Sequence, residues 1–140
     1  MPKPRPIRKA DHLEIGRLGE NFVKAHLEKD HWQILAERWH CRWGELDLVV
    51  VKSAEKILSF VEVKTRRQNS LDQQGILAIT LSKQRKIIKA AMQFLAEFPE
   101  YENYGCRFDV ALVTHQVNSL ADEQFLLEQY LESAFEVDEF

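Results

Sequence analysis

Residues 44–51 read GELDLVVV, residues 57–65 read ILSFVEVKT, and the polar link KSAEK joins them. Runs so rich in Val, Leu and Ile predict β-strands, and so short a link predicts that they pair as an antiparallel hairpin. Both runs are apolar on either side of their few charged residues, which is typical of strands in a sheet that is covered on both faces. The hairpin therefore predicts the middle of a layered domain.

The acids and the lysine of this hairpin are expected to share one face. If the turn is centred between residues 54 and 55, the numbers of paired residues sum to 109, so Asp47 lies opposite Glu62 and Glu45 lies opposite Lys64. Two opposed carboxylates, with Cβ atoms about 5 Å apart, repel by roughly 3 kcal/mol at an effective dielectric near 20. A cation is needed to offset that repulsion.

Mg²⁺, or Mn²⁺ in its place, is the cation that these donors favour, because it takes one or two carboxylates together with water and phosphate oxygens. Lys64 would add positive charge near the attacking water or the scissile phosphate. Asp47, Glu62 and Lys64 thus predict metal-assisted hydrolysis of a phosphodiester. The alternative is a solvated hairpin face on which Lys64 simply pairs with Glu45 or Glu62, and the apolar surroundings of the acids favour function over it.

The segments around the hairpin predict an α/β fold. Residues 13–29 carry apolar residues at helical spacing, and a second helix is expected to start at a cap by Thr80 or Ser82 and to stop before Pro99. Further strands are predicted at 32–38, at 107–114 and, more weakly, at 124–128. The order α-β-β-β-α-β predicts a sandwich of helices around a mixed central sheet.

The 140 residues suit one domain, at 11–135, between a flexible basic arm at 1–10 and an acidic tail at 136–140. No apolar run approaches the roughly 20 residues that cross a bilayer, and the first residues lack the apolar segment of a secretory signal, so we expect a soluble, cytoplasmic protein without a membrane partner. The two cysteines, Cys41 and Cys106, are expected to be reduced packing residues.

The net charge of −3 conceals an asymmetry along the chain. Residues 120–140 hold seven acids and neither Lys nor Arg, which leaves 19 basic against 15 acidic residues elsewhere. Basic residues gather after the hairpin (Arg66, Arg67) and on the second predicted helix (Lys83, Arg85, Lys86, Lys89), where free backbone N–H groups also attract phosphate. We expect these residues to follow a nucleic-acid backbone; the alternative is an ordinary solvated lysine face.

Glu20 is a third candidate carboxylate. On a helical wheel it lies beside Gly16 and Val23, toward the body of the protein. Gly16 and Gly19 are expected to let this helix approach the sheet closely. From the residues alone Glu20 is as suitable for the rim of the site as for a metal ligand. Trp39 and Trp43 could stack on bases, although core or hairpin packing is favoured.

Four motifs carry a resemblance to a known family: Gly16-x-x-Gly19-Glu20, Gly44-Glu45-Leu46-Asp47-Leu48, Phe60-Val61-Glu62-Val63-Lys64-Thr65-Arg66 and Arg107-Phe108-Asp109-Val110. Together they resemble the bacterial YraN family, itself similar to the PD-(D/E)xK nucleases and to archaeal Holliday-junction resolvases. The resemblance implies a restriction-endonuclease-like fold in which Glu20, Asp47, Glu62 and the Val63 carbonyl bind the metal and Lys64 is the catalytic cation. It also implies that Gln84 faces the site, and it leaves the motif around Asp109 structural.

These observations predict a metal-dependent nuclease that acts on DNA more readily than on RNA, with branched and single-stranded forms among the candidate substrates. A homodimer would suit the cutting of two strands, although no sequence feature defines its interface. One alternative is a nucleic-acid-binding module that keeps the fold without catalysis. Another is an interaction protein whose acidic tail engages a basic partner or screens its own basic face.

Overall fold

The computed structural model of the chain describes residues 12–68, 79–119 and 122–137. Its elements are α1 (His12–Lys29), β1 (Gln33–Cys41), β2 (Gly44–Lys52), η1 (Ser53–Glu55), β3 (Ile57–Arg67), α2 (Leu81–Glu97), η3 (Pro99–Tyr101), β4 (Gly105–Ser119) and β5 (Asp122–Phe135). Each predicted helix and strand is present, and the weak strand at 124–128 is the middle of the 14-residue strand β5. The predicted basic arm and the last residues of the predicted tail lie outside the described residues.

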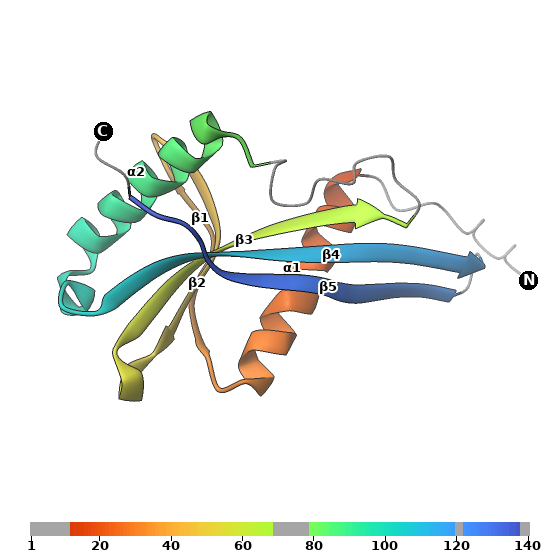
Figure 1. The fold of residues 1–140 in the computed structure, drawn as a ribbon, viewed down its shortest axis with the longest axis horizontal. Helices are drawn as coiled ribbons and strands as arrows, with labels where there is room; N and C mark the ends of the chain where they lie inside the picture. The colour runs from red at the N-terminus through yellow and green to blue at the C-terminus, as the bar shows by residue number, and fades with distance from the viewer. Residues whose placement is uncertain (1–11, 69–78, 120–121, 138–140) are drawn as a thin grey trace, which may run out of the picture.

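The five strands form one mixed sheet in the order β1-β2-β3-β4-β5 (Figure 1). β3 and β4 run parallel, because α2 carries the chain back across the sheet between them, and the other neighbouring strands are antiparallel. The predicted hairpin register is confirmed, since Leu48 pairs with Val61 and Lys52 with Ile57. The predicted α/β fold with a mixed central sheet is therefore confirmed.

The two helices cover opposite faces of the sheet. α1 buries Val23 and Leu27 against Leu48, Val50 and Val61. α2 buries Ile87 and Phe94 in the other cluster, with Val49, Val51 and Phe60 of the hairpin. Because side chains alternate along a strand, Glu62 shares with Phe60 the face that α2 covers. The alternation is interrupted at Asp47, since Leu46 and Val49 on either side of it both belong to the cluster under α2. No helix within the described ranges is long and apolar enough to span a membrane.

Local contacts explain where the helices begin and how closely they pack. Thr80 caps α2, since its side chain accepts a hydrogen bond from the Lys83 backbone N–H at 3.1 Å. On α1, a Cβ atom at Gly19 would collide with the hydroxyl of Thr65 on β3, so the predicted close approach is confirmed at that glycine. It is wrong for Gly16, where a Cβ atom would meet nothing within 4 Å.

Candidate active site

The candidate site lies where β2 separates from β3. Their ladder ends at the pair Leu48–Val61, whereas β3 continues beside β4 as far as the pair Arg67–His115. Figure 1 shows the ribbons of β2 and β3 diverging near the middle of the sheet. Asp47 and Glu62 are the first residues beyond the last pair. Oδ2 of Asp47 accepts a hydrogen bond from the Val63 N–H at 2.9 Å, so this carboxylate replaces the carbonyl that a continued ladder would supply.

Burial makes this group of acids costly. The side chain of Glu62 is almost fully enclosed, and Asp47 is half-buried next to it. Burial, followed by the negative charges of Glu62 and Glu20, raises the pKa of Asp47 to about 8, although the Val63 N–H favours the charged form. Near neutral pH the site therefore favours either a proton or a cation at Asp47.

Two cations of the protein already neutralise the other acids. Nζ of Lys83, from the first turn of α2, lies 2.6 Å from Oε1 of Glu62. Burial lowers the pKa of Lys83, but the adjacent Glu62 outweighs that effect and raises it. Arg38 of β1 donates from Nε to Oε2 of Glu20 at 2.6 Å, and this hydrogen bond raises the pKa of the guanidinium. Both helices thus contribute a charged group to the surroundings of Asp47 and Glu62: α1 contributes Glu20 and α2 contributes Lys83.

Arg38 occupies an unusual backbone position beside Asp47. Its strand neighbours Glu37 and Trp39 pair with Leu48 and Leu46, which sets Arg38 opposite Asp47. Its φ angle is 46°, in the left-handed region that residues other than glycine rarely adopt. Sequence reasoning gave Arg38 no part in the site. A signal was available in the short segment between the two strands: a turn at residues 42–43 makes the numbers of paired residues sum to 85, which sets Arg38 opposite Asp47.

The donors suit a hard cation. Among the described residues no three His, Cys, Asp or Glu side chains are grouped tightly enough to hold a metal ion, and Glu20 is bound to Arg38. Asp47 and Glu62 remain as two neighbouring carboxylates, which is the number that Mg²⁺ commonly takes while keeping most of its waters. The N–H and the carbonyl of one strand residue point to the same side, so the Val63 carbonyl faces the gap that its N–H bridges.

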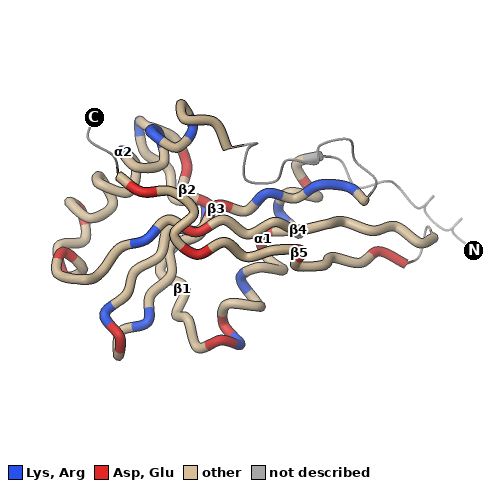
Figure 2. Tube along the Cα trace, viewed as in Figure 1, with Lys and Arg blue, Asp and Glu red and all other residues tan. Residues whose placement is uncertain are grey.

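The other predicted site residues lie at different distances from the acids. Lys64 is half-buried two residues beyond Glu62 and, within the described chain, forms no ion pair with Glu45 or Glu62. The side chain of Gln84 donates to the Ile79 carbonyl at 3.1 Å, so it stabilises the start of α2. Lys86 lies on the outer side of α2, and Figure 2 shows Lys and Arg gathered on the first turns of this helix.

Arg66 and Arg67 end β3 on the far side of the gap. The guanidinium of Arg66 lies 2.7 Å from the carboxylate of Glu128 on β5, and Arg67 is exposed. The hydrogen bonds from Arg66 and from Thr114 lower the pKa of Glu128. Several acids of the C-terminal segment thus belong to a strand and pair with neighbouring strands, which the sequence reading of an acidic end did not foresee.

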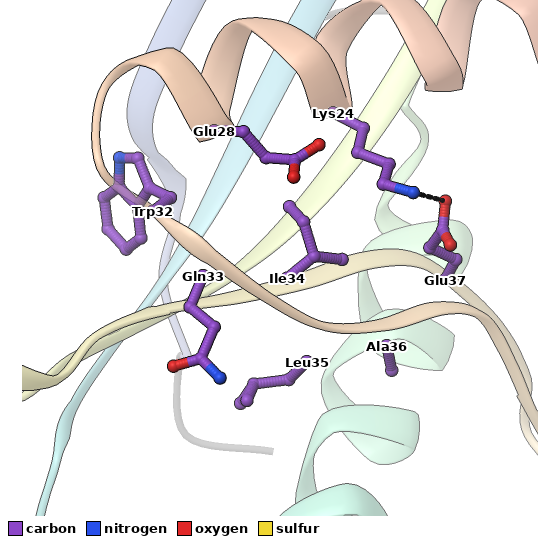
Figure 3. A pocket seen from close by; sticks show the side chains of 8 residues that line it. All are labelled: Lys24, Glu28, Trp32, Gln33, Ile34, Leu35, Ala36 and Glu37. Carbon is purple, nitrogen blue, oxygen red and sulfur yellow. Dashed lines mark ion pairs between the residues drawn. The ribbon is translucent and has the colours of Figure 1, made fainter.

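Two hollows lie on the surface of the described chain. One, of about 590 Å³, lies between α1 and the edge strand β1, where Trp32 and Ile34 form part of its wall (Figure 3). Lys24 and Glu37 form an ion pair of 3.3 Å there, and Glu28 adds a second acid. This hollow contains none of the predicted site residues. The other, of about 480 Å³, lies beside the first turns of α2 and includes Lys86.

Comparison with known proteins gives a consistent match across the chain. The model of the family described as "Uncharacterised protein family UPF0102" matches residues 19–113. A UPF0102 protein from Synechococcus sp. (strain JA-3-3Ab) is 46% identical over 137 residues, which cover 98% of both chains. UPF0102 proteins from Trichormus variabilis and Acaryochloris marina are 43% and 38% identical, over 89% and 94% of this chain and 96% and 95% of their own.

Proposed function

Because the chain belongs to the UPF0102 (YraN) family, whose description assigns no activity, we propose from the site itself that the protein is a metal-dependent nuclease. The observation that carries this proposal is the pair of the half-buried Asp47 and the buried Glu62 at the point where β2 leaves β3, with Lys64 two residues beyond Glu62. Burial and the charge of Glu62 raise the pKa of Asp47 to about 8, so a proton or a cation at Asp47 stabilises the pair. A divalent cation and a phosphate would account for both the acids and the lysine.

The residues divide the chemistry among them. Mg²⁺ or Mn²⁺ would be held by Asp47, Glu62 and the Val63 carbonyl. Glu20 would lie outside these direct ligands. The bound ion would make a water more acidic and would draw charge from the scissile phosphate. Lys64 adds fixed positive charge next to the phosphate. Lys83, once Glu62 turns to the metal, is free to bind a phosphate oxygen, so metal binding prepares the site for its polyanionic substrate.

The fold supports the same proposal. The mixed sheet, the crossover through α2 and a carboxylate contributed by α1 support the proposal of a restriction-endonuclease-like arrangement. DNA is the preferred substrate class in this proposal, and branched and single-stranded forms are included because nothing in the site demands a continuous duplex. The proposal includes the resemblance of the four motifs to PD-(D/E)xK nucleases and Holliday-junction resolvases.

The experiment is a cleavage assay with matched variants. The purified protein is incubated in Mg²⁺ or Mn²⁺ with labelled duplex, single-stranded, flap and four-way-junction DNA and with RNA. We expect the parent to cleave at least one DNA form, and Asp47→Asn and Glu62→Gln to lose at least about 100-fold in rate. Glu55→Gln, an exposed acid at the far end of the hairpin, should cleave as the parent does. Folded variants that keep the parent rate would contradict the proposal.

A second candidate function is nucleic-acid binding without catalysis. The observation in its favour is that Lys83 and Arg38 already neutralise Glu62 and Glu20, so these two acids are stable without a metal. This module would bind the oligonucleotides in EDTA as tightly as in Mg²⁺ and cleave none of them. Divalent-dependent cleavage that Asp47→Asn abolishes would exclude it.

A further inference from the structure

A basic groove runs along the outer side of α2, beside the turn between β1 and β2. Its walls include Arg42, Trp43, Ser82, Arg85, Lys86 and Lys89, and its volume is about 480 Å³. Four of these residues are basic, and no acid among the described residues lines it. Arg42, Lys86 and Lys89 alone bring three positive charges around one hollow, where they repel one another and attract an anion. The composition of the groove therefore favours a polyanion.

Trp43 holds two of these cations in place. The guanidinium carbon of Arg42 lies 4.4 Å from the centre of the Trp43 ring, and Nζ of Lys89 lies 4.6 Å from it. The ring also packs against the core cluster below α2, so its position is fixed. The groove is thus a built feature, in which one aromatic ring orients a cation from the turn and a cation from the helix.

The helix presents the remaining groups on one side. Ser82, Arg85, Lys86 and Lys89 follow the spacing i, i+3, i+4 and i+7, away from the buried side that carries Ile87 and Phe94. Ser82 lies in the first turn of the 17-residue helix, where free backbone N–H groups add to the attraction for phosphate.

The groove is connected to the acids through β2. Asp47 follows Trp43 by four positions at the start of β2, and extended chain covers about 13 Å over that interval. This length corresponds to a few nucleotides of one strand. Lys83 lies one turn before Lys86 on the same helix, next to Glu62, and continues the basic surface toward the carboxylates.

We propose that this groove binds the sugar–phosphate backbone of a nucleic-acid strand, a few nucleotides from the phosphate at Asp47 and Glu62. The distance in nucleotides rests on the proposed function, because it is counted from the cleaved bond. The binding itself does not, since the groove contains none of the residues that would hold the metal.

The test measures binding in EDTA, where no cleavage occurs. A labelled 20-nucleotide single strand and its duplex are titrated with the parent, Lys86→Ala, Lys89→Ala and the double variant over a range of salt concentrations. Each lost phosphate contact lowers the slope of log affinity against log salt by about 0.7 to 0.9, so the double variant should lose about 1.5 in slope and roughly 10-fold in affinity at low salt. Lys29→Ala removes an exposed charge from α1, on the other face, and should match the parent.

Other outcomes overturn the proposal. A double variant with the affinity and salt slope of the parent would do so, as would a parent that binds neither oligonucleotide. A competition experiment distinguishes a protein partner. If polyglutamate releases the oligonucleotide as readily as unlabelled oligonucleotide does at equal charge, the groove binds an acidic protein instead.

Groove-dependent binding without cleavage would contradict the proposed nuclease activity but not the proposed role of the groove. If the parent cleaves, strands that end at the cut should lose their dependence on Lys89; continued dependence would refute the placement of the groove beside the site.

Discussion

Two aspartates of the sheet, the buried Asp109 and the half-buried Asp47, have very different surroundings. Asp109, in the middle of β4, is fully enclosed and accepts hydrogen bonds from Ser59 Oγ at 2.7 Å, Tyr130 Oη at 2.8 Å and the Ser133 N–H at 3.0 Å. The guanidinium of Arg107 adds a fourth partner at 3.1 Å. Asp47, at the start of the gap between β2 and β3, accepts one hydrogen bond from Val63 and faces two other acids.

The difference separates a structural acid from a functional one. A buried carboxylate with several donors and a cation is stabilised in its charged form; burial, followed by the charge of Asp109, raises the pKa of the half-buried Tyr130 beside it. A carboxylate among other carboxylates is destabilised in its charged form, which favours a proton or a cation beside it. Four predictions test this contrast.

The largest effect is expected from Asp109→Ala. The substitution leaves Arg107, Ser59 and Tyr130 without their acceptor in a dry part of the sheet, and breaking such a buried network costs about 3 to 5 kcal/mol. Urea unfolding should show that loss, whereas Glu55→Ala, at an exposed turn, should change the free energy of unfolding by less than about 0.5 kcal/mol. A loss below 1 kcal/mol for Asp109→Ala would remove the structural half of the contrast.

The opposite sign is expected from Asp47→Asn. The amide oxygen can still accept from the Val63 N–H, while the charge beside Glu62 is removed. In EDTA at pH 9 the free energy of unfolding should rise by about 2 kcal/mol. The pKa shift of Asp47, at about 1.4 kcal/mol per unit, implies a larger gain. The expected gain is smaller because water and structural relaxation reduce the cost of the charge. Urea unfolding with Glu55→Gln as the reference measures it. Destabilisation of Asp47→Asn would mean that Asp47 is structural like Asp109.

The sequence predicts much of this site because the hairpin has a short link. KSAEK leaves little freedom in the turn, so the register that brings Asp47 to Glu62 follows from the length of the link and the alternation of side chains, and the structure has the same register. The cap at Thr80 and the end before Pro99 are likewise local, and both are confirmed. The sequence was sufficient for these features because residues close together in the chain determine a hairpin register, a helix cap and a helix end.

The parts that the sequence did not predict depend on contacts between distant residues. The pairing of Lys83 with Glu62 depends on how α2 lies on the sheet, and the pairing of Arg38 with Glu20 depends on a left-handed residue inside a strand. Neither has a local signature. Asp109 was expected to be structural, but its donors come from three strands, so its network could not be listed before the strand order was known.

A pH titration without metal sharpens the contrast between the two acids. Asp47 has a pKa of about 8 in the folded chain and near 3.8 when unfolded, so between those values the folded state keeps a proton that the unfolded state has lost. Stability therefore falls as pH rises through this window, by at most about 1.4 kcal/mol per pH unit. Urea midpoints from pH 4 to 9 should fall less steeply for Asp47→Asn than for the parent. Parallel curves would show that Asp47 does not titrate there.

The smallest effect is expected from Thr65→Val, which tests an uncharged group near the same gap. The Thr65 hydroxyl is buried against Gly19 and has no hydrogen-bond partner within the described residues, whereas the polar groups around Asp109 are all paired. Replacing an unsatisfied hydroxyl with a methyl group of similar shape should stabilise the protein by about 0.5 to 1 kcal/mol. Thr65→Ser keeps the hydroxyl and serves as the control. If Thr65→Val is less stable than Thr65→Ser, the Thr65 hydroxyl has a hydrogen-bond partner in the folded protein. Asp47 would then be the group near this gap whose shortage of partners calls for a ligand.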